Sequence, residues 1–267
     1  MVLEHWDLRQ EPFANVPGGG ALFYSSPQHE EALNRMLYVV RHRKGVGMLT
    51  GEVGCGKTTV TRALAACLSG EPYEVVVLAN PALSPEELLK AILVKLTGRM
   101  ENGSKAWVLE QIHRHLQTAE AAGRRVVLVI DEAHVISQRD TLDELRMLLN
   151  LHTEESFLLT LILLGQPPLL RTMAGLEPLR ERIALRYNLQ PLDCGHTIRY
   201  LLHRLRAAGA RRGIFTRAAA ELLHEASGGI PLRINNLGDR CLLIGFQWGA
   251  RQVDRRIVQA AVEDMNA

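Results

Sequence analysis

Residues 51–59 read Gly51-Glu52-Val53-Gly54-Cys55-Gly56-Lys57-Thr58-Thr59 and match the pattern G-x-x-x-x-G-K-[ST]. An apolar run, residues 46–49, precedes this stretch, and apolar residues at helical spacing follow it. Glycines in such a loop let backbone N–H groups turn inward as an anion-binding nest, and the dipole of the following helix adds to the attraction. The sequence therefore predicts a phosphate-binding loop between a buried strand and a helix.

Two side chains of this loop have predicted roles. Lys57 is expected to reach the β- and γ-phosphates of a nucleotide, and Thr58 is expected to give its hydroxyl to Mg²⁺. The other positions of the cradle are Gly51, Glu52, Val53, Gly54, Cys55, Gly56 and Thr59. A glycine-rich turn can also simply connect a strand to a helix without binding anything, but the Lys-Thr pair and the preceding strand favour a phosphate loop. Because no Asn-Lys-x-Asp stretch is present to select guanine, we expect ATP rather than GTP.

An acidic pair follows residues 126–130, the most hydrophobic of the predicted strands. The carboxyl ends of parallel strands border one crevice, where ligands bind. We therefore expect Asp131 to hold Mg²⁺ and Glu132 to orient or deprotonate the attacking water. The alternative is a helix N-terminus decorated with acids. His134 completes an Asp-Glu-Ala-His stretch that superficially resembles a helicase box, but no second helicase core follows.

Polar residues also follow two other predicted strands. Gln166 comes after strand 157–164 and is expected to sense the γ-phosphate, with a loop glutamine of no special role as the alternative. Asn80 ends the strand at residues 74–79. It either holds Glu132 inactive until a partner arrives or only begins the Asn-Pro turn.

Three arginines, Arg180, Arg182 and Arg186, lie just before the last predicted strand, residues 187–189. An arginine supplied by a neighbouring subunit can stabilise the charge of the transferring phosphoryl group. We expect Arg182 to be this arginine finger and Arg186 to be the next candidate, while ordinary surface arginines are the alternative. Arg233, at the start of a predicted C-terminal helix, could reach the phosphates from the helical side.

The composition is that of an ordinary globular protein. The chain has 267 residues, is 47% hydrophobic and carries a net charge of +2. With so small a net charge, we expect no strong overall electrostatic attraction to nucleic acid. The four cysteines form no C-x-x-C pair, which favours neither zinc nor disulfides and fits a reducing cytoplasm. We expect no membrane span and no signal peptide, because long apolar windows and an N-terminal apolar segment are both absent.

The distribution of patterns predicts three regions. Residues 1–44 form an N-terminal strap and helix, and their aromatic residues either pin the strap to the core or wall the adenine. In residues 45–191, buried strands alternate with helices, which favours an α/β fold with a parallel sheet. From residue 192 strand-like runs stop, and helices near 194–208, 216–227, 231–248 and 254–265 predict an all-helical lid.

Taken together, the phosphate loop, the acidic strand end, the polar third strand end, the arginines and the helical lid resemble an AAA+ ATPase. The chain resembles most closely the ExeA/GspA (general secretion pathway) and MshM-like family. The residues that carry this resemblance are Pro12-Phe13, Pro17, Phe23-Tyr24, Ser26, Ala32-Leu33, Gly51 to Thr59, Ile130 to His134, Leu164 to Pro167, Arg182 to Leu192 and Gly229 to Pro231.

The resemblance implies an ATP- and Mg²⁺-dependent homo-oligomer, either a ring such as a hexamer or a helical filament. It implies a cytoplasmic protein peripheral to the inner membrane, with a secretion or pilus protein as partner. The membrane span and peptidoglycan-binding domain that often follow in this family are missing, so we expect a shortened chain or a stand-alone member. The family usually has arginine directly after the lid proline, where this chain has Leu232, so Arg233 either takes over the lid role or the role is weakened.

Related AAA+ proteins regulate transposition by forming ATP-dependent helical assemblies on DNA, and they share the same motifs. Four arginines of the predicted lid could form a local basic face for this purpose: Arg204, Arg206, Arg211 and Arg212. A solvated helix end is the alternative interpretation. Coupling to secretion or pilus assembly is thus the first hypothesis, and an ATP-gated DNA clamp is the second.

Overall fold

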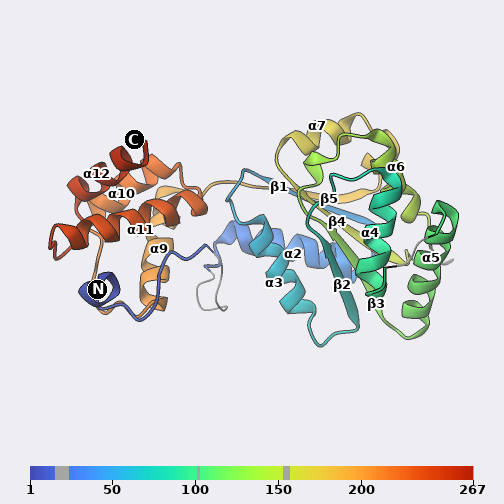
Figure 1. Cartoon of the computed structure of the whole chain (residues 1–267), viewed down its shortest axis with the longest axis horizontal. Helices are drawn as coiled ribbons and strands as arrows, with labels where there is room; N and C mark the ends of the chain where they lie inside the picture. Colours follow the sequence, from blue (N-terminus) through green and yellow to red (C-terminus); the bar gives the residue numbers. More distant parts are fainter. Residues whose placement is uncertain (16–23, 101–102, 153–156, 267) are drawn as a thin grey trace. The chain divides into compact units, whose positions relative to one another are not determined.

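The computed structural model describes residues 1–15, 24–100, 103–152 and 157–266. Its elements follow the chain in the order shown in Figure 1. They are α1 (Val2–His5), α2 (Pro27–Arg41), β1 (Val46–Gly51), α3 (Lys57–Leu68), β2 (Tyr73–Leu78), α4 (Pro85–Thr97), α5 (Lys105–Ala121), β3 (Arg125–Ile130), η2 (Ala133–Val135), α6 (Arg139–Leu148), β4 (Leu159–Gly165), α7 (Pro168–Ala174), α8 (Glu177–Arg180), β5 (Ile183–Leu189), α9 (Cys194–Ala207), α10 (Arg217–Ser227), α11 (Pro231–Gln247) and α12 (Arg255–Asn266).

The strands form one five-stranded parallel sheet in the order β2-β3-β4-β1-β5. Every residue of β1 and β4 is buried, as expected for central parallel strands that are covered on both faces. The predicted parallel α/β core and the helical C-terminal region are confirmed. Because β4 lies between β1 and β3, the ends of these three strands meet at one edge of the sheet.

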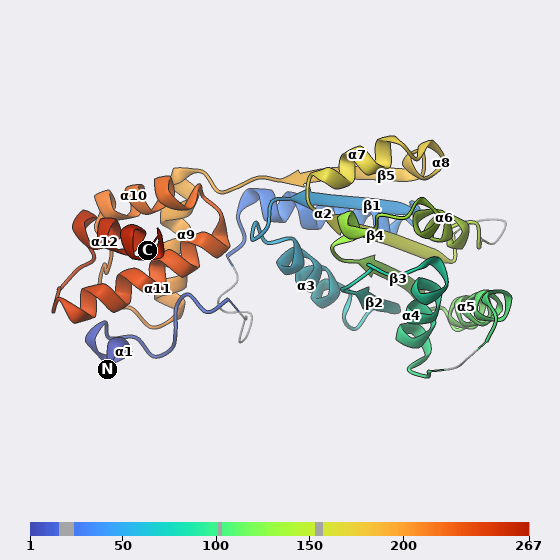
Figure 2. The same ribbon diagram turned by 45° about the horizontal axis from the view of Figure 1, so that its top comes forward.

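Helices cover the sheet on both faces (Figure 2). One face packs on α4 to α8 in a single hydrophobic cluster that includes Met48, Leu128 and Leu161. On the other face, a Cβ built at Gly47 would lie 3.1 Å from the Met36 sulfur of α2, and α3 contacts β1 and β2. Successive residues of a strand therefore pack against helices on opposite faces of the sheet, which explains the continuous apolar runs in the sequence.

Local signals set most helix boundaries correctly. At the start of α4, the Ser84 hydroxyl accepts from the Glu87 N–H while the Glu87 carboxylate accepts from the Ser84 N–H, which forms a capping box. The Ser84 hydroxyl, which donates to the Glu87 carboxylate at 2.6 Å, and the Ser84 N–H together hold the pKa of Glu87 below its usual value. The predicted start of the last strand was wrong, because β5 begins at Ile183 and not at Tyr187, so Arg186 lies inside the strand.

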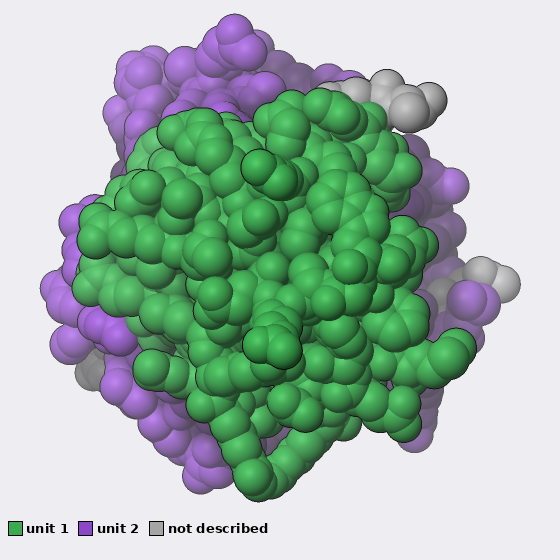
Figure 3. Space-filling model, turned by 90° about the vertical axis from the view of Figure 1, so that its left-hand side faces the viewer, with its two compact units in different colours: residues 1–28, 53–56, 190–267 green, residues 29–52, 57–189 purple. Residues whose placement is uncertain are grey.

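The described chain forms two compact units, which Figure 3 colours separately. Unit 1 contains residues 1–28, 53–56 and 190–267, and unit 2 contains residues 29–52 and 57–189. The predicted N-terminal region 1–44 is therefore divided: α2 packs on the sheet, while the residues before it group with the C-terminal helices. No helix within the described ranges is both long and apolar enough to cross a membrane.

The N-terminal aromatic residues belong to the core of unit 1. Trp6 and Phe13 are both fully buried among α9 to α12, and the Trp6 indole N–H donates to the Leu242 carbonyl at 2.9 Å. These two rings are thus anchors, and the alternative that they wall the adenine is wrong. Phe23, another of these aromatic residues, and Pro17, which carries part of the family resemblance, lie outside the described residues.

A buried arginine fixes the same segment. The Arg204 guanidinium donates from Nε to the Pro12 carbonyl at 2.5 Å and from Nη2 to the Ala14 carbonyl at 2.7 Å. It also donates to the Tyr200 hydroxyl at 3.3 Å. The side chain is 7% exposed, so the prediction that Arg204 contributes to a basic surface was wrong. An arginine on an amphipathic helix normally extends into solvent, but here two backbone carbonyls of a distant segment bind it.

Candidate functional site

The phosphate loop connects β1 to α3. Gly54 and Gly56 adopt φ values of 82° and 102°, which side-chain-bearing residues rarely adopt, so the loop depends on glycine at these positions. The Lys57 side chain is only 6% exposed, and its ammonium group donates to the carbonyls of Gly51 at 2.8 Å and Glu52 at 3.1 Å. The loop's own backbone thus holds the lysine across the loop, as a phosphate cradle requires.

Close packing explains a third glycine of the loop, Gly51. A Cβ built on Gly51 would lie 2.7 Å from the Leu189 carbonyl oxygen of β5, the neighbouring strand. At the preceding position of β1, the Thr50 hydroxyl donates to the Asn188 side chain at 3.0 Å. These contacts fix the strand from which the loop departs.

The acidic strand end meets the start of α3. The Thr58 hydroxyl donates to Asp131 Oδ2 at 3.3 Å, and the Glu132 backbone N–H donates to Asp131 Oδ1 at 2.9 Å. Asp131 is 9% exposed. Both carboxylate oxygens are therefore oriented by hydrogen bonds, and a hydroxyl and a carboxylate, which are both oxygen ligands of the kind that Mg²⁺ accepts, lie in contact with each other.

Glu132 occupies a strained backbone position. Its φ of 53° and ψ of 32° place it in the left-handed region, which costs a non-glycine residue about 1–2 kcal/mol. Its side chain is 45% exposed, and one carboxylate oxygen lies 3.2 Å from the Nδ1 atom of His134. The carboxylate that is predicted to act on water is thus accessible to solvent and held by an imidazole.

Gln166 follows β4, between the strands that carry the phosphate loop and the acidic pair. Its side-chain Nε2 lies 2.8 Å from His134 Nε2, and its backbone nitrogen lies 3.3 Å from His134 Nδ1, which can accept its N–H when Nδ1 carries no proton. Lys57, Thr58, Asp131, Glu132 and Gln166 therefore share the carboxyl edge of the sheet. The sequence interpretation missed His134; its place three residues after Asp131, behind a buried strand, was the available signal.

The arginines lie elsewhere. Arg182 directly precedes β5 and therefore sits at the amino edge of the sheet, next to the residue that pairs with Val46. Its Nη2 donates to the Asn150 side chain at 2.5 Å, and its Nη1 is buried without a hydrogen-bond partner among the described residues. Arg186 lies inside β5, is exposed, and donates to the Arg180 carbonyl at 3.4 Å. Neither arginine joins the cluster at the carboxyl edge.

Arg233 is exposed in the first turn of α11. Its neighbour Leu232 contacts the part of the phosphate loop that belongs to the same compact unit. The Leu232 N–H donates to the Gly54 carbonyl at 3.3 Å, and a Cβ on Gly54 would lie 2.5 Å from the Leu232 Cβ. The position where the family usually has arginine is thus occupied by a leucine that packs on a loop glycine.

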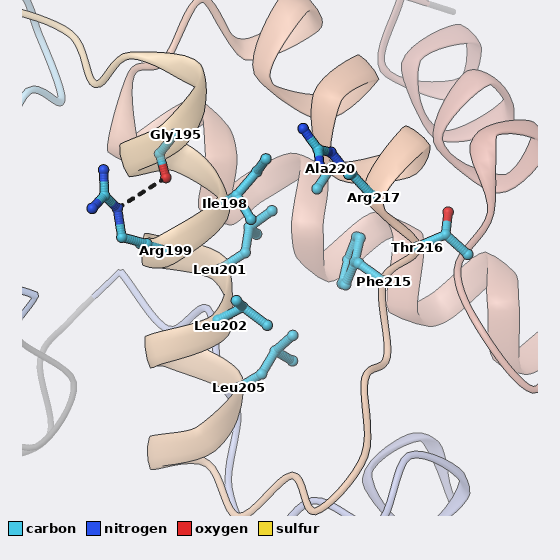
Figure 4. Close-up of a pocket in the computed structure, with 10 residues that line it drawn as sticks. All are labelled: Gly195, Ile198, Arg199, Leu201, Leu202, Leu205, Phe215, Thr216, Arg217 and Ala220. Atoms are coloured by element: carbon cyan, nitrogen blue, oxygen red, sulfur yellow. Dashed lines mark hydrogen bonds between the residues drawn. The ribbon is translucent and has the colours of Figure 1, made fainter.

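A separate groove lies between α9 and α10 in unit 1 (Figure 4), with a volume of about 450 Å³. Its walls are mainly apolar and include Ile198, Leu202 and Phe215. Arg199 also lines the groove, and its Nε donates to the Gly195 carbonyl of its own helix. None of the predicted site residues lies there, so the groove is distinct from the nucleotide site.

The residues at the carboxyl edge fit ATP and Mg²⁺. The positive φ values of Gly54 and Gly56 give the loop the form of an anion nest, and the adjoining Lys57 supplies a cation. Thr58 and Asp131 offer oxygen ligands of the kind that Mg²⁺ prefers. The cationic loop therefore suits the charge of the ATP phosphates, and the two oxygen ligands suit Mg²⁺.

Comparison with protein families gives an independent assignment. The family model described as AAA domain matches residues 40–173, which is half of the chain and includes the phosphate loop, the acidic pair and Gln166. General secretion pathway protein A of Aeromonas hydrophila is 38% identical over 258 residues, which are 95% of this chain and 46% of that protein. The chain thus spans less than half the length of this relative.

Solved structures share the fold at lower identity. CDC6p from Pyrobaculum aerophilum matches 95% of this chain and 70% of its own with a TM-score of 0.75 and 16% identity. Drosophila ORC bound to DNA matches 96% of this chain and 65% of its own, with a TM-score of 0.72 and 20% identity. The Thermotoga maritima RuvB branch migration motor matches 89% of this chain and 70% of its own, with a TM-score of 0.59 and 22% identity. The chain belongs to the AAA domain family, and the predictions of an AAA+ ATPase and of a resemblance to the ExeA/GspA group are confirmed.

Proposed function

We propose that this chain hydrolyses ATP with Mg²⁺ as a homo-oligomer and couples turnover to the assembly of a secretion or pilus machine at the inner membrane. The observation that carries the proposal is the convergence of Lys57, Thr58, Asp131 and Glu132 at one sheet edge. The similarity to general secretion pathway protein A over 95% of this chain supports the biological setting.

Each residue at the edge has a role that its surroundings support. Lys57 and the loop N–H groups, from Gly51 to Thr59, bind the phosphates. Thr58 and Asp131 hold Mg²⁺, which when bound neutralises charge on the phosphate oxygens. Glu132 has a carboxylate open to solvent, so it orients and deprotonates the attacking water.

Arg182 serves a neighbouring subunit in this proposal. β1 and β5 run parallel from the pair Val46 and Ile183 to the pair Gly51 and Leu189. Arg182 is therefore about 20 Å along the strand direction from the phosphate loop of its own chain. An arginine side chain does not span that distance, so a catalytic role for Arg182 requires a head-to-tail contact, which closes into a ring such as a hexamer or continues as a filament. Arg186, exposed on the same edge strand, is the second candidate.

The setting follows from the relative named as a secretion pathway protein. We propose a cytoplasmic location, peripheral to the inner membrane, with a membrane-associated secretion or pilus protein as partner. Arg233 is proposed as the lid residue that responds to the phosphates, in place of the usual arginine one position earlier.

The alternative, an ATP-dependent DNA-binding regulator of transposition, loses part of its support. Of the four arginines proposed for a basic face, Arg204 is buried, and Arg212 lies 3.7 Å from the Asp7 carboxylate and donates to the His5 carbonyl. The similarity to DNA-bound ORC is below 25% identity and shows the fold alone. The local basic face is thus reduced to Arg206 and Arg211.

The test is the ATPase rate and particle size of the purified chain, with and without double-stranded DNA at stated salt. The secretion or pilus proposal predicts closed rings with ATP and a turnover that DNA does not change. DNA-stimulated turnover with helical particles on DNA would contradict it and favour the alternative. A Lys57→Ala variant without turnover is the control that assigns the activity to this site.

A further inference from the structure

His134 lies between the two polar residues that are predicted to act on the reacting groups. It belongs to the short helix η2, and its imidazole is 14% exposed. One ring nitrogen, Nδ1, is 3.2 Å from the Glu132 carboxylate, and the other, Nε2, is 2.8 Å from the side-chain Nε2 of Gln166. A single ring thus touches both the residue proposed to activate water and the residue proposed to sense the γ-phosphate.

The proton count of the ring makes these two contacts interdependent. A neutral imidazole carries one N–H, so one ring nitrogen donates and the other accepts. When the Gln166 NH₂ group donates to His134 Nε2, the ring proton is on Nδ1 and can be donated to Glu132. When the Gln166 amide oxygen faces the ring instead, Nε2 must carry the proton. Nδ1 then accepts the Gln166 backbone N–H, which lies 3.3 Å away, and Glu132 loses its donor.

We propose that His134 is a positioning residue that couples the amide orientation of Gln166 to the release of Glu132. The inference rests on the proposed ATPase function of the same sheet edge. An acceptor such as a phosphate oxygen draws the NH₂ group of Gln166 toward it, which turns the amide oxygen to the ring. The imidazole changes tautomer, and the Glu132 carboxylate becomes free to orient water only when the nucleotide is in place.

The surroundings favour His134 over the other candidate for this task. The sequence pointed to Asn80 as the residue that might restrain Glu132, but Asn80 Oδ1 accepts the Ala82 N–H at 3.3 Å within its own turn. Glu132 has a left-handed backbone directly before η2, and its carboxylate lies 3.2 Å from His134 Nδ1 of that helix. His134 is also the residue that reaches Gln166, so it alone of the two contacts both partners.

A spectroscopic test reads the tautomer directly and does not depend on turnover. Side-chain ¹⁵N chemical shifts of His134 are measured at a pH where the ring is neutral, using a His134→Gln variant to assign the signal. We expect the Nδ1–H form in the chain without nucleotide and the Nε2–H form after addition of Mg²⁺ and a non-hydrolysable ATP analogue. In a Gln166→Ala variant the analogue should leave the tautomer unchanged. An Nε2–H ring without nucleotide, or a tautomer that does not respond, would overturn the proposal.

A kinetic test separates coupling from simple loss of a contact. We expect Gln166→Ala to lower kcat about tenfold, because the ring then keeps its proton on Nδ1 and the Glu132 carboxylate stays held. His134→Ala removes the donor that holds Glu132, so combining it with Gln166→Ala should bring kcat back to within about twofold of the His134→Ala value. Losses that multiply in the double variant would contradict the coupling.

His115→Ala is the matched control, because His115 pairs with Glu74 at 2.8 Å and is also half-buried. It should leave kcat within about twofold of the wild-type value. Glu132→Gln distinguishes this inference from the proposed function. If Glu132→Gln abolishes turnover while His134→Ala does not offset the loss in Gln166→Ala, only the coupling is wrong. If the wild-type chain has no turnover, the proposed function is wrong, and the tautomer in the nucleotide-free chain still decides whether His134 is placed as described.

Discussion

Thr58 and Asp131 are 73 residues apart in the sequence, and the hydroxyl of the first donates to the carboxylate of the second at 3.3 Å. This contact joins the first turn of α3 to the carboxyl end of β3 across the strand β4. It brings together the two side chains that are proposed to hold Mg²⁺. The Glu132 N–H on the other carboxylate oxygen sets the orientation of Asp131, so the backbone of the next residue is part of the same arrangement.

Replacing Glu132 with Gln should abolish ATP turnover and preserve ATP binding. The amide has nearly the shape of the carboxylate but cannot accept a proton from water, so we expect kcat to fall at least about a hundredfold. Turnover is measured by phosphate release and affinity by a fluorescent ATP analogue. Unchanged turnover would remove Glu132 from the mechanism.

Replacing Gly54 with Ala should weaken nucleotide binding about tenfold or more. The new Cβ would lie 2.5 Å from the Leu232 Cβ, at a φ of 82° that alanine adopts only at a cost of about 1–2 kcal/mol. Gly70→Ala is the matched control, because Gly70 has a φ of 86° and a Cβ added there would meet nothing within 4 Å. The control should lose a similar amount of stability and keep its nucleotide affinity; equal affinity losses in both variants would count against a special role for Gly54.

Replacing Arg204 with Ala should lower the free energy of unfolding of unit 1 by about 3 kcal/mol. The buried carbonyls of Pro12 and Ala14 lose their donors, and Tyr200 loses a neighbour. Urea unfolding followed by tryptophan fluorescence measures the change. Arg206→Ala, an exposed position on the same helix, is the control and should change stability by less than about 0.5 kcal/mol. A similar effect of both variants would show that Arg204 is not an anchor.

Asp239 should make unit 1 more stable at low pH than at high pH. Burial raises the pKa of this carboxyl from 3.8 to about 6, and the nearby Glu11 adds to the rise while Arg204 opposes it. A raised pKa means that the folded state binds the proton more tightly than the unfolded state. This contribution is therefore complete below the unfolded pKa and is lost as the pH rises through about 6.

Asp239→Asn consequently should raise Tm at pH 8 and have a smaller effect at pH 4.5. Because Asp239 is exposed, solvent screening limits the gain at pH 8 to about 1–3 °C. Thermal unfolding at the two pH values measures it, and Glu225→Gln, an exposed carboxylate of the same unit, is the control. A gain that is equal at both pH values would contradict the raised pKa.

The sequence was sufficient for the central strands, because a strand that is buried on both faces is a continuous apolar run with a polar residue at its end. It was not sufficient for β5. This edge strand is exposed at Ala184, Arg186 and Asn188, so the alternating pattern hid its first half. The phosphate loop could be identified from local residue types alone, because its chemistry lies in consecutive positions.

Contacts between segments that are distant in the chain could not be predicted from the sequence. Arg204 and Pro12 are 192 residues apart, and nothing in the amphipathic pattern of α9 shows that its arginine binds backbone carbonyls. His134 and Gln166 are 32 residues apart and meet only because β3 and β4 are neighbours in the sheet. Strand order, which the sequence does not state, decides which polar strand ends touch.

Mixing two inactive variants shows whether Arg182 of the next subunit completes each site. Glu132→Gln subunits keep Arg182, and Arg182→Ala subunits keep Glu132, so a mixed interface can combine one intact copy of each. After mixing at equal concentrations, with sedimentation showing that both variants assemble, random assembly should restore about one quarter of the wild-type ATPase rate. A mixture as inactive as its two components would show that Arg182 does not complete the site of a neighbouring subunit.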